Sequence, residues 1–183
     1  MNTALLLIDI QNDYFPGGKY PLCRPQEAAV QAARMISFFR SHGKPIFHVQ
    51  HLGKADAPFF VPGTRGADIH PSVRPLDNEP CIIKHSPDSF FETTLRCHLQ
   101  ENHIESLVIC GMMTHMCVDT TVRAARNFGY AVSVIEDACA CRSLVWKGLA
   151  IPAGTVQSVF LSALQGSFAD VLPAESWLSK QHE

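Results

Sequence analysis

Apolar segments alternate along the chain with segments of helical periodicity, and this alternation gives the first prediction of its structure. Short apolar runs are typical of strands buried on both faces of a sheet; they occupy residues 4–10, 45–49, 81–84, 107–111, 131–136 and 168–172. Apolar residues at helical spacing predict helices over residues 25–42, 91–102, 117–128 and 152–165. The first of these helices is expected to end at Gly43.

Strands that alternate with helices predict an α/β fold, in which a mainly parallel sheet is covered on both faces and the crossovers are right-handed. Residues 50–80 carry many Pro, Gly and Asp residues and no clear period. A loop of that length inside a compact domain is usually functional. No repeat, linker or low-complexity segment divides the 183 residues, so we expect a single domain over residues 1–183.

Composition and charge exclude several classes of protein. Hydrophobic residues make up 46% of the chain and charged residues 17%, which suffices for a core and is too apolar for disorder. The formal net charge is −2 and there is no run of Lys and Arg, so neither a nucleic acid nor a membrane surface is an expected partner. No apolar run reaches the roughly 18 residues of a membrane span.

The cysteines and the start of the chain indicate the compartment. The seven cysteines are irregularly spaced, unlike a secreted disulfide framework, and no pair of CxxC motifs predicts a structural zinc site. The first residues lack the basic start and the cleavage site of a signal peptide. We therefore expect a cytoplasmic protein with reduced thiols.

Three chemically reactive residues follow predicted strands. Asp9 lies at the end of the first apolar run, Lys84 ends the third, and Cys117 follows the turn after the fourth. In parallel α/β sheets the site lies beyond the carboxyl ends of the strands. We therefore expect these residues to meet at one edge of the sheet, although they lie far apart in the sequence.

A buried carboxylate or ammonium group is costly unless it is paired. Asp9 and Lys84 can each relieve the burial of the other, although a structural hydrogen bond to a neighbouring turn would explain either residue alone. A thiol placed between a base and a cation is the general arrangement of an activated nucleophile. The spacing in the sequence does not decide between these interpretations.

Cys117 lies in the most informative stretch, where a strand ends at Gly111 and a helix is predicted to begin near Thr114. Thr114 is the expected N-cap of that helix. In its first turn the helix dipole would stabilise a thiolate, and unpaired N–H groups would hold an oxyanion. The alternative is that Cys117 is a small buried apolar residue. That is our interpretation of the other six cysteines, Cys23, Cys81, Cys97, Cys110, Cys139 and Cys141.

Four sequence elements resemble those of the isochorismatase-like hydrolases, a superfamily that includes nicotinamidases, N-carbamoylsarcosine amidohydrolases, ureidoacrylate hydrolases and isochorismatases. LLLIDIQNDYF at residues 5–15 resembles the family's D-x-Q-x-D-F element, and Lys84 followed by SFFETTL at 89–95 resembles K…S-x-F-x-x-T-x-L. GMMTHMCV at 111–118 resembles G-x-x-T-x-x-C-V, and DACACR at 137–142 resembles D-A-x-A-x-R. Together and in this order, the elements identify the chain as a member of the superfamily.

The resemblance implies a three-layer Rossmann-like sandwich, with a six-stranded, mainly parallel sheet, that assembles into homodimers or tetramers. It implies a catalytic triad in which Asp9 is the base for the Cys117 thiol and then the acid for the leaving amine, while Lys84 holds Asp9 and stabilises the thiolate. The oxyanion would bind the N–H groups of Met113 and Cys117, beside a cis peptide bond between Met112 and Met113. The implied activity is hydrolysis of a C–N bond in a small amide, ureide or carbamoyl compound through a thioester.

The chain departs from the nicotinamidase branch at the metal site. That branch places an Asp-x-His pair after the second strand, where this chain has His51 and Gly53. The remaining trio of His48, His51 and His70 has no carboxylate and is more typical of a surface or a pocket wall. No metal or other cofactor is therefore expected.

Two further positions bear on the reaction. True isochorismatases lack a cysteine at the nucleophile position, so Cys117 favours C–N cleavage over vinyl-ether hydrolysis. Gln157 stands where many relatives carry His, so any role of that His is lost. Candidate walls of an aromatic-lined pocket for a small planar substrate are Phe15, His51, Phe59, Phe60, Phe90, Thr114 and His115, although at least half of the Phe residues are expected in the core.

Two other functions stay open at this point. One is an isochorismatase-type hydrolase of vinyl ethers, and the other is a catalytically silent, oligomeric module that binds a small molecule. A dinucleotide-binding domain is excluded, because Gln11 and Asn12 follow the first strand where the phosphate-binding G-x-G-x-x-G would stand.

Overall fold

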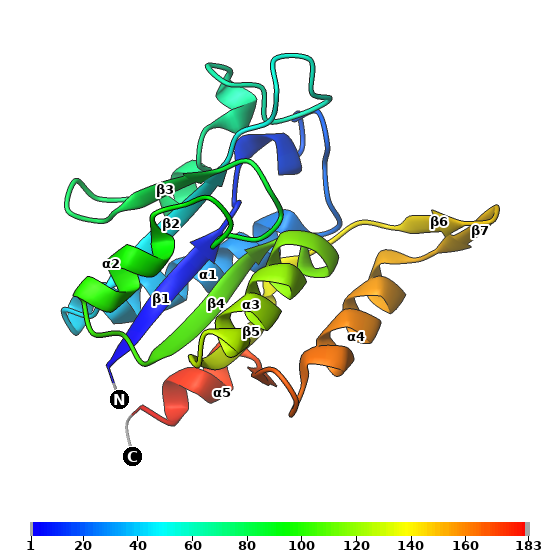
Figure 1. The fold of residues 1–183 in the computed structure, drawn as a ribbon. Helices are drawn as coiled ribbons and strands as arrows, with labels where there is room; N and C mark the ends of the chain where they lie inside the picture. The colour runs from blue at the N-terminus through cyan, green and yellow to red at the C-terminus, as the bar shows by residue number, and fades with distance from the viewer. Residues whose placement is uncertain (1, 182–183) are drawn as a thin grey trace.

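The structure is a computed structural model that describes residues 2–181. At its centre lies a six-stranded sheet in the order β3-β2-β1-β4-β5-β8, and every neighbouring pair of strands is parallel (Figure 1). Its strands are β1 Thr3–Ile8, β2 Ile46–His51, β3 Cys81–Lys84, β4 Ser106–Met112, β5 Ala131–Ala140 and β8 Asp170–Leu172. The predicted α/β fold with a parallel sheet is confirmed.

Helices cover both faces of the sheet. On one face lie α1 (Pro25–Ser41) and α5 (Ala174–Ser179), and on the other lie α2 (Leu95–Glu101), α3 (Asp119–Asn127) and α4 (Ala153–Leu164). This is the expected three-layer arrangement. Between residues 2 and 181, no helix has the length and apolar character needed to cross a bilayer.

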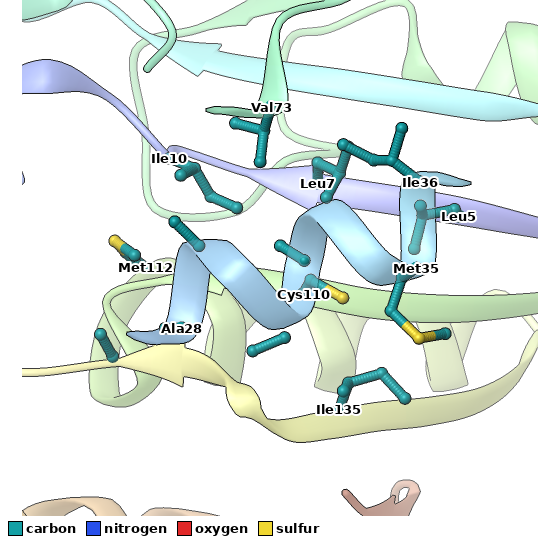
Figure 2. Close-up of a cluster of buried hydrophobic side chains, with 14 of the residues drawn as sticks. Leu5, Leu7, Ile10, Ala28, Met35, Ile36, Val73, Cys110, Met112 and Ile135 are labelled. Carbon is teal, nitrogen blue, oxygen red and sulfur yellow. The ribbon is translucent and has the colours of Figure 1, made fainter. Parts of the chain in front are cut away.

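The alternating side chains of β1 divide the core into two halves. Leu5 and Leu7 pack with Met35 of α1, as Figure 2 shows. Leu6 and Ile8 belong to the second cluster, beneath α2 and α3. Successive strand residues point to opposite faces, so the unbroken apolar run of β1 satisfies both halves and fixes this strand at the centre of the molecule.

Helix α2 begins four residues later than the helix predicted over 91–102, and side chains explain the difference. Asp88 Oδ1 accepts a hydrogen bond from the N–H of Phe90 (2.8 Å), and Thr93 Oγ1 donates to the carbonyl of Ser89 (2.6 Å). Asp and Thr side chains that bond nearby backbone groups compete with helix formation. The segment before Leu95 is therefore a turn closed by its own side chains.

Three features of the fold were not predicted from the sequence pattern: the full length of β5, the helix α5 and a second sheet. β5 continues four residues beyond Glu136, because its register against β4 shifts between Ile109 and Gly111 and so accommodates two acidic residues. The short helix α5 and a two-stranded sheet were not predicted, since each is too short to show a period. That second sheet consists of β6 Leu144–Trp146 and β7 Leu149–Ile151.

The structure also corrects the interpretation of three cysteines as buried residues. Cys23, Cys81 and Cys97 are exposed, whereas Cys110, Cys139 and Cys141 are buried. Cys81 lies on the edge strand β3, where alternate side chains face solvent. A thiol on an edge strand has no second layer to cover it.

An ionic network fastens the end of the long loop over residues 50–80 to the body of the protein. Glu79 accepts hydrogen bonds from Arg40 Nε (2.7 Å) of α1 and from the N–H of Leu76 (3.0 Å), and its Oε2 lies 3.0 Å from Nε2 of the buried His48. Burial alone would raise the pKa of Glu79, but these hydrogen bonds together lower it to about 2. The carboxylate therefore stays ionised and holds its three partners in place.

We predict that Glu79→Gln lowers the free energy of unfolding at pH 7 by about 2 kcal/mol, because the charge-assisted bonds are lost from a largely buried site. The pKa of Glu79 is depressed by folding, so its stabilising effect is present above the unfolded carboxyl pKa of about 4.3 and is lost as the pH falls towards 2. Denaturant unfolding of both proteins between pH 7 and pH 2 tests this. The difference in free energy of unfolding between the two proteins should become smaller as the pH falls. A difference that stays constant would contradict the stabilising role of the Glu79 carboxylate.

Candidate active site at the carboxyl ends of the strands

The sheet order brings the predicted reactive residues to one edge. Asp9 directly follows β1, His51 is the last residue of β2, and Lys84 is the last residue of β3. Cys117 lies in the turn after β4. Since β3, β2, β1 and β4 are parallel neighbours in this order, their carboxyl ends lie side by side, as expected for a site in this class of sheet.

Asp9 and Lys84 form a fully buried ion pair. Lys84 Nζ lies 2.8 Å from Asp9 Oδ2, and the two side chains are 0% exposed. Lys84 also donates to His51 Nδ1 (3.1 Å) and to the carbonyl of Ser86 (2.9 Å). Burial alone would lower the pKa of Lys84, but the negative charge of Asp9 and the hydrogen bonds to Asp9 and Cys117 raise it above its ordinary value. The lysine therefore remains a cation inside the protein.

The carboxylate of Asp9 contacts both the cation and the thiol of the site. Its Oδ2 is paired with the Lys84 ammonium at 2.8 Å, and a hydrogen bond with Asp9 contributes to the raised pKa of the Cys117 thiol. The backbone of Asp9 adopts a left-handed conformation with φ +51°, which Asp tolerates better than most residues. A buried carboxylate between an ammonium group and a thiol is placed to exchange a proton with the sulfur, and this favours a chemical role.

Cys117 lies in the π-helical turn Thr114–Val118 and is 5% exposed. Its Sγ, a carboxylate oxygen of Asp9 and a ring nitrogen of His51 all lie within 4.8 Å of one another. Burial and the Asp9 carboxylate raise the pKa of the thiol, and Lys84 offsets only part of that increase. The expectation of a thiolate stabilised by the helix dipole is therefore wrong for the resting site, because a second buried anion beside Asp9 is unfavourable.

The turn before Cys117 also differs from the prediction. Thr114 does not cap the helix; its Oγ1 donates to Oε1 of Gln157 on α4 (2.7 Å). The carbonyl of Met113 accepts instead from the N–H groups of Met116 (3.0 Å) and Val118 (3.3 Å). The peptide bond between residues 112 and 113 is cis, at the position that the resemblance indicated.

Gly111 allows β4 to approach the residue before Asp9. Its φ is +153°, and a Cβ at this position would lie 2.3 Å from the carbonyl oxygen of Ile8. A side chain there would push the end of β4, and the turn that carries Cys117, away from Asp9. The glycine is thus required by a close approach of two backbones.

His51 has one tautomer in this arrangement. An ammonium group can only donate, so Nδ1 accepts from Lys84 and the ring proton is on Nε2. Burial lowers the pKa of His51, and Lys84 and His85 lower it further against the opposing charge of Asp9. The side chain of Gln11 bonds both the carbonyl (2.9 Å) and the N–H (2.8 Å) of His51. His51 is therefore a neutral side chain with its proton on Nε2, and Gln11 holds its backbone in place.

Tyr14 is a residue of the site that the sequence analysis did not single out. It is buried, its ring centroid lies 4.6 Å from that of Phe60, and Phe60 lies 6.0 Å from His51. Burial and the Asp9 carboxylate raise the pKa of its hydroxyl above the ordinary value. Tyr14 aligns with the Phe of the D-x-Q-x-D-F element. Because the family residue there is apolar, the resemblance did not indicate a hydroxyl at this position.

Most of the other predicted wall residues have neighbours outside the triad. Phe15 stacks on His70 with ring centroids 3.7 Å apart. Phe90 packs against Phe128 (5.1 Å) in the core cluster beneath α3, and the ring of His115 lies 5.8 Å from that of Phe160 on α4. Of the predicted wall residues, His51 and Phe60 have contacts that connect them to the ion pair.

The three histidines considered as metal ligands do not converge. His48 pairs with Glu79, and His70 bonds Ser72 (2.8 Å). Asp9, His51 and Cys117 do offer ligand atoms to one point, but the Lys84 ammonium contacts two of these residues. A cation placed there would lie against an existing positive charge, so the site does not suit a metal ion.

Removal of the Asp9 charge should make Cys117 more reactive. In Asp9→Asn the neighbouring anion is gone while the Lys84 cation remains, so the pKa of the thiol should fall. We expect Cys117 in this variant to be alkylated by iodoacetamide at pH 7.5 at least 10-fold faster than in the unaltered protein. Intact-mass spectrometry measures the rate, with Cys117→Ala to identify the modified residue. Slower alkylation in Asp9→Asn would show that the Asp9 charge does not hold the proton on sulfur.

Comparison with known proteins shows the family to which the chain belongs. The isochorismatase domain model matches residues 3–175. The isochorismatase family protein YddQ of Bacillus subtilis (strain 168) is 51% identical over 179 residues, which cover 97% of this chain and 99% of YddQ. An isochorismatase-family crystal structure from Oleispira antarctica superposes with a TM-score of 0.95 at 45% identity, and covers 97% of this chain and 96% of that one.

Two more distant relatives carry the names of their substrates. Streptothricin hydrolase of Streptomyces noursei is 31% identical, over 74% of this chain and 48% of its own length. The nicotinamidase of Escherichia coli (strain K12) is 27% identical, over 74% of this chain and 82% of its own length. Because the family model spans nearly the whole chain and a relative of equal length shares half of its residues, the protein belongs to the isochorismatase family of hydrolases.

Proposed function

We propose that the protein cleaves a C–N bond of a small amide, ureide or carbamoyl compound through a thioester on Cys117. The observation that carries the proposal is the position of Asp9, a buried carboxylate that Lys84 holds at 2.8 Å and that lies within 4.8 Å of the Cys117 sulfur. The names of two relatives support the choice of bond, since a nicotinamidase acts on an amide and streptothricin hydrolase belongs to the same family. A cysteine next to a proton acceptor suits attack on a carbonyl carbon.

In the first step the Cys117 sulfur attacks the substrate carbonyl while the thiol proton passes to Asp9. The raised pKa of the thiol does not prevent this, because the proton leaves as the C–S bond forms and no free thiolate accumulates. Lys84 remains protonated and offsets the negative charge of the site throughout. In this proposal the N–H groups of Met113 and Cys117 bind the oxyanion, an interaction that contributes about 3–4 kcal/mol in comparable enzymes.

In the second step Asp9 returns the proton to the substrate nitrogen, the C–N bond breaks and the amine leaves. Water then gives a proton to Asp9 and attacks the thioester carbonyl. Collapse of that adduct releases the acid, and the proton returns to the sulfur. Each proton taken by Asp9 is given back, so one water molecule is consumed and the enzyme is unchanged. A single carboxylate thus serves as base and acid in turn.

His51 adds a requirement on the substrate. Its Nε2–H is available as a donor, because Lys84 occupies Nδ1. A substrate that carries an acceptor next to the scissile carbonyl, such as a second carbonyl oxygen or an unprotonated ring nitrogen, would pair with this group. The buried ring of Phe60 lies 6.0 Å from that of His51 and packs against Tyr14, so these two aromatic residues support His51 from within the protein. The homo-oligomeric state, the cytoplasmic location and the single-domain organisation stay predictions.

A screen of small primary amides, ureides and carbamoyl compounds, read by release of amine or ammonia, tests the proposal. We expect at least one to be hydrolysed, with kcat reduced at least 1,000-fold in Cys117→Ala and in Asp9→Asn, because the nucleophile and the base each contribute a factor of this order. Cys97→Ala removes an exposed thiol elsewhere and serves as the matched control, which should keep full activity. Circular dichroism confirms that the variants are folded.

Two outcomes would contradict the proposal. Hydrolysis that survives Cys117→Ala would revive the vinyl-ether hydrolase. Tight binding of a compound without turnover, unchanged in both variants, would favour the binding module.

A strong chelator should leave kcat and KM unchanged, since the Lys84 ammonium occupies the position where a cation would bind. Dialysis against EDTA, followed by assay with and without added Zn²⁺ or Mn²⁺, measures this. A loss of activity that one of these ions restores would show that the site does use a metal.

A further inference from the structure

The β6–β7 hairpin is an arm without a core of its own. Within the described part of the chain, its two strands pair only with each other, and Figure 1 shows it extending away from the central sheet. Lys147 and Gly148 form its turn, both with positive φ. A lone two-stranded hairpin is marginally stable in water, so this arm needs a surface to lie against.

The apolar side chains of the arm are exposed. Val145, Trp146 and Leu149 are 72%, 67% and 68% exposed, and they are among the most exposed large apolar residues of the described chain. Exposed aromatic and aliphatic groups gathered on one short element mark a binding surface. Lys147 is the only charged residue of the arm.

A cleft with a complementary character opens at the base of the arm. It has a volume of about 350 Å³ between the start of α1 and the start of α4. Its lining combines apolar groups such as Ala28, Ala140 and Ala153 with one basic residue, Arg24, and three acidic ones, Glu27, Glu136 and Asp137. A second hollow of about 540 Å³ continues it along α4, and Glu136 and Asp137 line both.

The acidic side chains of the cleft differ in what they contact. Glu27 is paired with Arg24, and Asp137 accepts a hydrogen bond from the N–H of Ala174 (2.8 Å). Between residues 2 and 181, Glu136 forms no ion pair with a cation and Lys147 forms none with a carboxylate. The Lys147 ammonium lies 5.9 Å from the ring centroid of its neighbour Trp146. The cleft therefore offers an unpaired negative charge, and the arm carries an unpaired positive one.

We propose that two copies of the chain associate by exchanging these arms, so that Trp146 and Leu149 of each copy fill the cleft of the other and Lys147 pairs with the partner's Glu136. The arm starts and ends at the rim of its own cleft, since Cys141 and Ala153 flank the arm in sequence and line the cleft. A two-fold axis beside the bases of the two arms would let each arm cross into the cleft of the other copy, which gives an isologous interface. The family resemblance implies an oligomer without indicating which surface forms it.

Sedimentation velocity of charge-reversed variants tests the exchange. Lys147→Glu and Glu136→Lys should each weaken dimerisation at least 10-fold, because each places like charges in contact at both crossings. In an equimolar mixture of the two variants, opposite charges meet again at both crossings of the mixed dimer. We therefore expect the mixture to recover dimers that neither variant forms alone. Lys54→Glu, which makes the same charge change at another exposed lysine, is the matched control and should dimerise normally.

Trp146→Ala should weaken the dimer without a charge change, and circular dichroism should show that every variant keeps its fold. A monomeric unaltered protein at 100 µM would overturn the proposal. So would dimers that persist in Lys147→Glu and Trp146→Ala, or a mixture that fails to recover them.

Discussion

The site depends on the buried ion pair between Asp9 and Lys84. Neither charge could be buried without the other. Asp9 follows β1 and Lys84 ends β3, with β2 between them. Strands lie 4.7–4.9 Å apart, so the pair must span roughly 10 Å. The long side chain of Lys84 covers that span and passes His51 at the end of β2, which it contacts at 3.1 Å. The order of the strands thus determines how far the Lys84 side chain must reach, which tautomer His51 adopts and where Asp9, the proposed base, lies.

The same pair explains why Cys117, the proposed nucleophile, rests as a thiol. A cation and an anion already balance each other at 2.8 Å, so a thiolate would add an uncompensated charge to a buried site. In the proposed mechanism, Asp9 accepts the thiol proton only as the sulfur gains a bond to the substrate. Gly111 makes this possible, because it lets the strand before Cys117 come close to the backbone before Asp9.

The sequence predicts the parts of this arrangement that depend on period and strand order. Five of the six strands and the position of Asp9, Lys84 and Cys117 at one edge follow from apolar runs in an α/β pattern, and β8 is correct in place but shorter. The sequence does not predict contacts that depend on the direction of side chains. Thr114 looks like an N-cap and instead bonds Gln157, and Phe90 packs in the core. The role of His51 as a donor requires the position of Lys84, which only the fold provides.

In the proposed reaction Cys117 carries the acyl group, and Asp9 supplies the proton transfers that release it. Rapid mixing with 4-nitrophenyl acetate, quenching and peptide mass spectrometry test it most directly. We expect one acetyl group on Cys117, short-lived in the unaltered protein and persistent in Asp9→Asn, where no base activates the water. Acetylation of another residue, or a thioester that hydrolyses equally fast in both proteins, would contradict the account.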